Sequence, residues 1–481
     1  MAQRDGHVWL VFSDLMANRV FFECGIVDRA REAFPDQLAA LFLVHEKHVR
    51  PWRARLDGID VLHGDDLIPK QVRPSERVVR RIDYELDKWI GFYPLALRHS
   101  LRHGFHRDRL AAGHPFAFLD VSRAGPLPRW RWLESAMTRW HLSARRYVPQ
   151  VLFERMRSDC RAVVLTNPQA HSSMPLLSAT RRLKVPTIGY IASWDHPVGK
   201  GIVSPYLDRY IVQNAAMRED LSRYHGIDPS RVVVTGWPQT DVFHRRRSRD
   251  AYCALLHGLG LSDGLPVVLY AGNTSSNAPY EANLVARLVS WWQESGANER
   301  FSLLFRPHPY DREVETRYHA VLADSDAALQ RSSFADLEDL VTLLQHVDAV
   351  VANAGTILLD ALVNDRPSVC VTFDEGAPKG ERHADLNLTG AHYREMVDSR
   401  AFYRADDFDE LVRTLDRALS EPGELRAERV RLAAEVVGEV DGRAAERVVA
   451  AIREVIVGGP AAVGATGERA VDPAFGDQSA G

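Results

Sequence analysis

The sequence predicts an α/β protein of two doubly wound domains that face a cleft, with a mostly helical insertion in the first domain. Three observations support this fold class: a length of 481 residues, short apolar runs separated by helix-length segments, and a charged connector at 244–249. Apolar residues make up 46% of the chain and charged residues 26%, which is typical of globular proteins and excludes a wholly disordered or coiled-coil chain.

The first domain is expected over residues 1–245. An apolar run at 7–13 predicts a buried strand, and helical spacing near 20–33 precedes a second strand at 38–44. Strand-like runs return later, at 162–166, 185–191, 210–212 and 232–236. Strands alternating with helices at this spacing predict a parallel sheet.

A basic and aromatic segment over about 71–156 interrupts this series and predicts the insertion. Residues 70–160 hold 18 Lys and Arg against 9 Asp and Glu, and tryptophans stand at 89, 130, 132 and 140. Tryptophan and basic residues together favour contact with an anionic membrane surface. The alternative is a solvated helical surface with its tryptophans in the core. No nucleic-acid motif accompanies the segment, so no nucleic-acid partner is expected.

The location expected for the chain is cytoplasmic, with peripheral contact on the inner face of the cell membrane. Its apolar runs are shorter than the roughly 18 residues that span a bilayer, and its start lacks a signal-peptide core.

The second domain is expected over residues 246–457, followed by a disordered tail at 458–481 that is rich in Gly and Ala. Its predicted strands lie at 266–271, 301–305, 349–352 and 368–371. Since open α/β sheets bind ligands at the carboxyl ends of their strands, the loops that follow these strands hold the candidate site residues.

The turn after the third of these strands predicts an anion site. Asn353, Gly355 and Thr356 lie between a strand and a helix, so backbone N–H groups and the positive helix end can meet an anion. Asp360 follows one helical turn later on the same face, where a carboxylate can hold sugar hydroxyls. The alternative is a helix N-cap with an ordinary surface Asp.

Arg306 and His308 stand at the end of the second strand, stiffened by Pro307 and Pro309. Together with the Asn353 turn, this strand end resembles the C-terminal half of GT-B glycosyltransferases. The similarity is to the branch that holds CDP-glycerol glycerophosphotransferases and UDP-N-acetylglucosamine 2-epimerases, and it extends to residues 234–241. The resemblance implies two Rossmann-like domains in which Arg306, His308, Gly355 and Thr356 meet the donor phosphates and Asp360 the ribose, with Asn353 also on the donor side.

A loop at 193–201 resembles the His-Gly-Thr-Pro-Leu-Lys loop of glycerophosphotransferases, with Asp195 or His196 in place of the first His. Either side chain could be the general base that takes a proton from an acceptor hydroxyl. The alternative for Asp195 is a turn-forming residue before Pro197.

Two further loops are weaker candidates for donor binding. Asn273 and Thr274 follow the first strand of the second domain and could cradle the diphosphate, or form an ordinary loop. By the resemblance, Ser332 and Ser333 take the place of the loop that contacts the nucleotide base. Asp324-Ser325-Asp326 has the shape of a metal-binding motif but lies in a loop of the wrong fold type, so no metal or other cofactor is expected.

The expected function is therefore a metal-independent, inverting glycosyltransferase of cell-envelope synthesis, with His308 counted among its catalytic residues. Its expected partners are a nucleotide-diphosphate sugar as co-substrate and a hydroxyl acceptor that is lipid-linked or a polysaccharide. Three alternatives stay open: a CDP-glycerol-type polyol-phosphate transferase, a nucleotide-sugar 2-epimerase and a non-catalytic GT-B scaffold.

Overall fold

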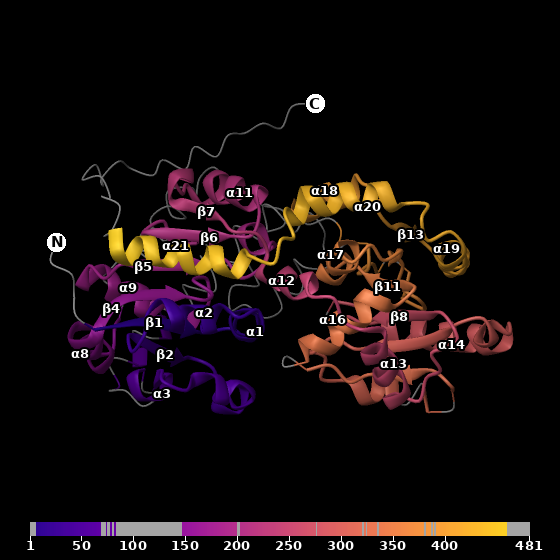
Figure 1. The fold of residues 1–481 in the computed structure, drawn as a ribbon, viewed down its shortest axis with the longest axis horizontal. Coiled ribbons are helices and arrows are strands. Elements are labelled where there is room, and N and C mark those ends of the chain that lie inside the picture. Colours follow the sequence, from indigo (N-terminus) through magenta and orange to yellow (C-terminus); the bar gives the residue numbers. More distant parts are fainter. Residues whose placement is uncertain are drawn as a thin grey trace. The chain divides into compact units, whose positions relative to one another are not determined.

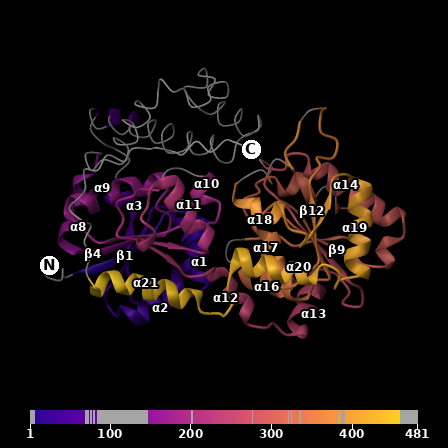
Figure 2. The same cartoon turned by 90° about the horizontal axis from the view of Figure 1, so that it is seen from above.

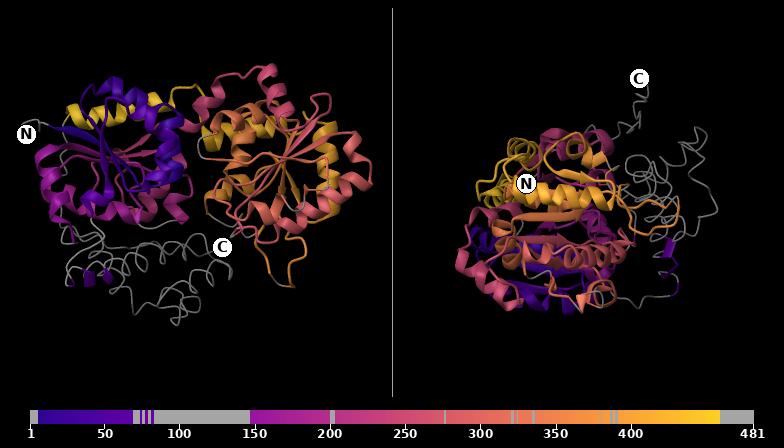
Figure 3. Two further views of the ribbon diagram at one scale, coloured as in Figure 1. Left: turned by 90° about the horizontal axis from the view of Figure 1, so that it is seen from below. Right: turned by 90° about the vertical axis from the view of Figure 1, so that its right-hand side faces the viewer.

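The fold comes from a computed structural model that describes residues 6–68, 74, 77–78, 81–82, 147–199, 203–275, 277–319, 322–323, 325–333, 336–379, 381–385, 388 and 391–458. Most of the predicted insertion and the tail from residue 459 lie outside these residues. The described residues divide into two compact units, one up to Pro238 and again from Arg443, the other Gln239–Gly442. Each unit has one parallel sheet between helices, which confirms the predicted fold class (Figures 1 and 3).

The first unit contains a seven-stranded sheet in the order β3-β2-β1-β4-β5-β6-β7. Its strands are β1 (His7–Phe12), β2 (Leu38–Phe42), β3 (Asp60–His63), β4 (Cys160–Leu165), β5 (Thr187–Tyr190), β6 (Arg209–Val212) and β7 (Val232–Val234). β2 and β5 are buried along their whole length, and β4 is buried except at Arg161, because helices cover both faces of the sheet. This burial explains why these strands are mostly apolar.

The first unit also contains helices, of which all but the last precede its final strand β7 in the chain. They are α1 (Leu15–Glu23), α2 (Ile26–Ala33), α3 (Gly64–Leu67), α8 (Gln150–Asp159), α9 (Met174–Leu183), α10 (His196–Gly199), α11 (Ala215–His225) and α21 (Ala444–Gly458), with short helical turns at Glu46–His48 (η1), Arg50–Leu56 (η2), His171–Ser173 and Pro229–Arg231. The helical stretch predicted near 20–33 is helical, but it is divided between α1 and α2, because Gly25 adopts a left-handed φ of 77° between them.

The last helix, α21, belongs to the first unit, although the sequence places residues 444–457 in the second domain. Its apolar side is buried at Val448, Ile452 and Val455, and it packs against α2, β4 and β6 (Figure 2). Arg447 Nε also donates to the carbonyl oxygen of Thr235 at 2.7 Å. The second unit is therefore inserted into the chain of the first.

The second unit contains a six-stranded sheet in the order β10-β9-β8-β11-β12-β13. Its strands are β8 (Val267–Ala271), β9 (Ser302–Arg306), β10 (Ala328–Leu329), β11 (Ala349–Asn353), β12 (Ser368–Val371) and β13 (Tyr403–Ala405). Its helices are α12 (Pro238–His244, which begins at the unit boundary), α13 (Arg249–Gly258), α14 (Glu281–Glu294), α16 (Leu337–His346), α17 (Thr356–Val363), α18 (Arg394–Val397), α19 (Phe408–Ser420) and α20 (Arg426–Leu432), with helical turns at Ala297–Glu299, Glu315–His319, Ala391–Tyr393 and Ala433–Val437.

One face of this second sheet carries a large apolar core. Leu288 of α14 and Leu415 of α19 are fully buried there against Val268, Val351 and Val369 of the central strands. This packing fixes the strand ends and the loops that leave them. Within the described part of the chain, no helix has the length and apolar content needed to cross a bilayer.

Candidate active site at the carboxyl edge of the second sheet

The second sheet has a topological switch point between β8 and β11. From β8 the chain runs outward through β9 and β10, then returns to β11 on the other side of β8 and continues to β12 and β13. Ligands of open parallel sheets bind where the connections diverge in this way. Asn273 and Thr274 follow β8, His308 follows the neighbouring β9, and the turn from Asn353 to Thr356 follows β11, so these predicted residues share one sheet edge.

The loop after β8 is held by a buried carboxylate that sequence reasoning missed. Both side-chain oxygens of Glu281, the first residue of α14, accept the N–H of Asn273 at 3.1 Å. Arg317 donates to the carbonyl oxygens of Asn273 and Ala278 at 2.9 and 2.7 Å. The loop backbone is thereby fixed at both ends, which preorganises it for a ligand.

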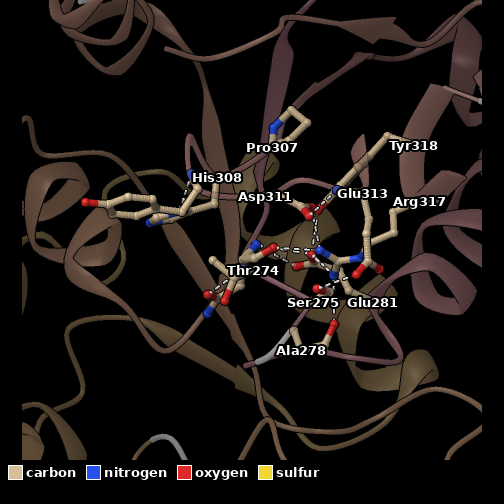
Figure 4. A network of polar contacts seen from close by, with 12 residues as sticks. Thr274, Ser275, Ala278, Glu281, Pro307, His308, Asp311, Glu313, Arg317 and Tyr318 are labelled. Carbon is tan, nitrogen blue, oxygen red and sulfur yellow. Dashed lines mark hydrogen bonds and ion pairs between the residues drawn. The ribbon is translucent and has the colours of Figure 1, made fainter. Parts of the chain in front are cut away.

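Arg317 joins two carboxylates beside this loop (Figure 4). It lies 2.8 Å from Glu281 and 2.5 Å from Asp311, and the three side chains are 5%, 1% and 0% exposed. The O–H of Tyr318 donates to Glu281 at 2.5 Å, and that of Tyr270 at 3.3 Å. Burial raises the pKa of Glu281 to about 7, while Arg317 and the hydrogen bonds oppose a larger rise.

The network also requires that residue 272 be a glycine, because the Tyr318 side chain packs directly against its backbone. A Cβ at this position would stand 2.0 Å from the hydroxyl oxygen of Tyr318. Glycine is therefore required here for steric reasons, and the Tyr318 hydroxyl can reach Glu281 only because residue 272 has no side chain.

Three predicted donor residues hold the end of β9 in place. The guanidinium of Arg306 is 6% exposed and donates to Gln330 and, at 2.9 Å, to Asp336. The hydroxyl of Ser332 donates to the carbonyl oxygen of Pro307, and the N–H of Ser333 to Asp336 at 2.8 Å. The observed contacts of Arg306, Ser332 and Ser333 thus position the segment that carries His308.

His308 itself is only partly buried. The N–H of Tyr310 donates to its Nδ1 at 3.1 Å, and the two rings stack with centroids 5.8 Å apart (Figure 4). A neutral imidazole that accepts on Nδ1 carries its hydrogen on Nε2. The ring can therefore present an N–H donor to a phosphate oxygen.

The turn after β11 provides backbone donors. Helix α17 begins at Thr356, which is exposed, and its N-cap residue Gly355 has no side chain that could cap the first N–H groups. Gly355 is extended (φ −175°), and a Cβ there would meet nothing closer than 3.7 Å, so the fold itself does not require a glycine. Asn353 is 5% exposed and donates to the carbonyl oxygen of Val371 at 3.2 Å; its Oδ1 has no hydrogen-bond partner among the described residues.

Asp360 lies one turn further along α17 and is 3% exposed. Both of its oxygens accept the side-chain N–H2 of Gln239 at 2.8 Å. Gln239 had no predicted role, although it stands within the 234–241 segment on which the family resemblance rests. The sequence does not predict that Gln239 contacts Asp360, because the two residues are 121 positions apart.

The predicted catalytic loop lies in the first unit, at the end of β5. Asp195 is partly buried and His196 is 8% exposed at the start of α10. Gln169 donates to the carbonyl oxygen of His196 at 3.1 Å. His225 of α11, another residue missed from the sequence, donates to the carbonyl oxygen of Pro197 at 2.7 Å and accepts the N–H of Val203 at 3.0 Å. The backbone of this loop is thus held by Gln169, which follows β4, and by His225 at the end of α11.

Among the residues that the structure describes, no group of three or more His, Cys, Asp or Glu side chains is placed to hold a metal ion. Asp324 of the discounted Asp-Ser-Asp motif lies outside these residues.

The chain resembles known structures across nearly its full length. A UDP-N-acetylglucosamine 2-epimerase from Neisseria meningitidis bound to UDP-N-acetylglucosamine is 10% identical with a TM-score of 0.55, over 93% of this chain and 100% of that one. The S. aureus MnaA-UDP co-structure is 12% identical with a TM-score of 0.52, over 94% and 97%. The TM-scores over nearly the full chains support a shared GT-B-like fold, as predicted from the resemblance.

No curated protein sequence matches the chain. A family profile does, over residues 203–454, which include the whole described second unit from α12 to α20 and most of α21. This match spans more than half of the 481 residues and confirms the predicted resemblance to the glycerophosphotransferases. The chain belongs to the CDP-glycerol:poly(glycerophosphate) glycerophosphotransferase family.

Proposed function

We propose that this protein transfers a polyol phosphate, such as glycerol phosphate, from a CDP-linked donor to a hydroxyl group of a cell-envelope polymer. The observation that carries this proposal is the family match over residues 203–454, because it covers every loop of the candidate site in the second unit. The sugar transfer expected from the sequence is the second candidate, since the same strand ends would hold any nucleotide diphosphate.

The reaction would be a phosphoryl transfer. The acceptor oxygen attacks the phosphorus that bears the polyol, and a new P–O bond forms. The bond from that phosphorus to the bridging oxygen breaks, CMP leaves with the bonding electrons, and the acceptor's proton passes to a base. Stabilising the charge on the leaving phosphate is the main catalytic requirement of such a step.

The second unit supplies groups suited to that charge. His308 presents an Nε2–H donor, and the uncapped N–H groups at the start of α17 form a positive helix end. We assign both to the donor diphosphate, together with the loop at Asn273 that Glu281 and Arg317 hold. These groups would take the role that a metal ion has in other transferases, so activity should survive a chelator.

The proton acceptor is assigned to the loop after β5. Asp195 and His196 are its candidates, and both stand on a backbone held by Gln169 and His225. A carboxylate or a neutral imidazole can each accept a hydroxyl proton as the P–O bond forms.

The direct test is nucleotide release by the purified full chain with CDP-glycerol and a poly(glycerol phosphate) oligomer. The same assay with UDP-, GDP- and dTDP-sugars separates polyol-phosphate transfer from sugar transfer, and loss of activity with EDTA would contradict the assignment without metal. His308→Ala should weaken donor binding about 10- to 150-fold, because it removes a hydrogen bond to a charged group. His257→Ala, at an exposed site on α13, is the matched control. Turnover of a nucleotide sugar without turnover of CDP-glycerol would refute the proposed donor.

A further inference from the structure

Helix α1 of the first unit contains a buried cation that has no counterion among the described residues. Arg19 is 6% exposed, and its Nε and Nη2 atoms are fully buried. Within the described part of the chain it makes no hydrogen bond and no ion pair. Asn18 beside it is 0% exposed, and both its amide oxygen and nitrogen lack a partner there.

Contacts of the neighbouring phenylalanines show which way these side chains face. Phe21 packs on Tyr190 of β5 with ring centroids 5.3 Å apart, and Phe22 stacks on Trp52 of η2 at 5.1 Å. Residues three and four apart share a helix face, so Asn18 lies above the sheet, one turn nearer the helix start than these rings. That turn is next to the carboxyl end of β1, because α1 begins directly after it.

Arg19 lies on the flank of α1 toward η2. It is three residues before Phe22 and four before Glu23, whose carboxylate accepts the indole N–H of Trp52 at 2.6 Å. Glu23 also pairs with Arg55 at 3.5 Å, so this carboxylate on the same flank already serves two donors. Arg19 thus stands at the carboxyl edge of β1 and β2, and no carboxylate in the described part of the chain pairs with it.

This edge is the switch point of the first sheet. The chain runs from β1 outward to β2 and β3, then returns to β4 on the other side of β1. Ligands of open parallel sheets bind at such a point. Ser13, in the loop after β1, donates to the carbonyl oxygen of Asn167, in the loop after β4, at 3.3 Å, so the two loops meet there.

The segment that follows β2 adds positive charge. Residues 45–56 contain Lys47, Arg50, Arg53 and Arg55 against a single acidic residue, Glu46. Arg53 pairs with Glu46, whereas Lys47 and Arg50 are exposed and have no ion pair among the described residues. An anion that approaches this edge therefore meets a favourable field.

A buried unpaired guanidinium and a buried unsatisfied amide are both unfavourable for folding. They are explained if a ligand completes their hydrogen bonds, and a phosphate oxygen suits Arg and Asn donors together. We propose that Arg19 and Asn18 form a binding site for a phosphate group of the acceptor chain. This inference rests on the proposed function, in which the acceptor is a phosphate-bearing polymer.

The first measurement is the thermal stability of the full chain. Arg19→Met removes the unpaired charge at similar volume, so it should raise Tm by at least about 2 °C without ligand. Asn18→Leu should act in the same direction. Arg53→Met, which changes an exposed arginine, should leave Tm nearly unchanged. A lower Tm in both Arg19→Met and Asn18→Leu would show that these residues stabilise the ligand-free fold, and would overturn the proposal.

The second measurement is calorimetric titration with glycerol 3-phosphate, with CMP in excess to fill the nucleotide site. The wild-type protein should bind, Arg19→Met should bind about 10- to 150-fold more weakly, and Arg19→Lys should retain part of the affinity. Equal affinity in wild type and Arg19→Met would refute the site.

Turnover of CDP-glycerol is measured separately. If binding depends on Arg19 but CDP-glycerol is not used, the donor assignment is wrong and the phosphate site stands. If CDP-glycerol is used but binding does not depend on Arg19, the site is wrong and the proposed function stands.

Discussion

Replacing Arg317 by Met should destabilise the second unit strongly. The variant leaves the buried carboxylates of Glu281 and Asp311 without their cation. It also removes the Arg317 hydrogen bonds to the carbonyl oxygens of Asn273 and Ala278. Breaking a buried ion pair by removing one partner costs about 3–5 kcal/mol. Since two carboxylates lose the same partner, we expect the upper part of that range.

The assay is urea unfolding at pH 8, with hydrogen exchange of the β8–α14 peptides to report on the second unit. Arg300→Met is the matched control, because Arg300 and Asp416 pair at 2.7 Å with side chains that are 57% and 44% exposed. Such a surface pair contributes about 0–1 kcal/mol. An Arg317→Met variant as stable as Arg300→Met would refute the view that this network supports the loop.

Coupling within the network gives a stricter version of the test. Adding Glu281→Gln to Arg317→Met removes one of the two carboxylates left unpaired. The double variant should therefore be less destabilised than the sum of the two single variants. Additive losses would mean that Arg317 and Glu281 stabilise the unit independently, despite their 2.8 Å separation.

Three further predictions concern other parts of the two units. The pKa of Glu281 is raised to about 7, so the folded state retains a proton that the unfolded state has released above pH ~4.3; stability should fall as pH rises through this window, by at most about 1.4 kcal/mol per pH unit, and Glu281→Gln should flatten that slope in urea titrations from pH 4.5 to 8. Gly272→Ala puts a Cβ 2.0 Å from a buried phenol oxygen and should cost about 1–3 kcal/mol, whereas Gly355→Ala, with 3.7 Å of clearance, should leave the melting curve unchanged; equal Tm losses would contradict the steric account. Asp195→Asn or His196→Ala should lower the single-turnover rate about 10²- to 10⁴-fold with donor affinity retained, and near-normal rates in both would exclude this loop as the source of the base.

The sequence predicts the central strands well because their signal is local. Runs such as Val267–Ala271 are buried on both sides and therefore apolar throughout. Strands at the sheet edges are not predicted in this way. In β3, Asp60 and Val61 are exposed, and β10 has only two residues, so neither shows an apolar run.

The sequence shows which candidate residues stand in strand-end loops, where the structure also places them, but it does not show which residues hold those loops; the binding roles stay predictions. His308 and the Asn353 turn are visible as polar groups directly after apolar strands. Glu281 and Arg317 look like ordinary charges on helical segments, since nothing local shows that they are buried 2.8 Å apart. The best available signal is the pair of consecutive small residues Ala271-Gly272 before the loop, which indicates close packing.

The return of the chain to the first unit at Arg443 constrains the order in which the protein can fold during synthesis. Helix α21 is the last described element to leave the ribosome, yet α2, β4 and β6 need it to cover their apolar surface. The entire second unit is translated before that cover exists, so it can finish folding while the first unit still exposes an apolar strip. A ribosome that stalls within the second unit would therefore leave an incomplete first unit, and nascent chains of this length are the ones for which a chaperone should matter most.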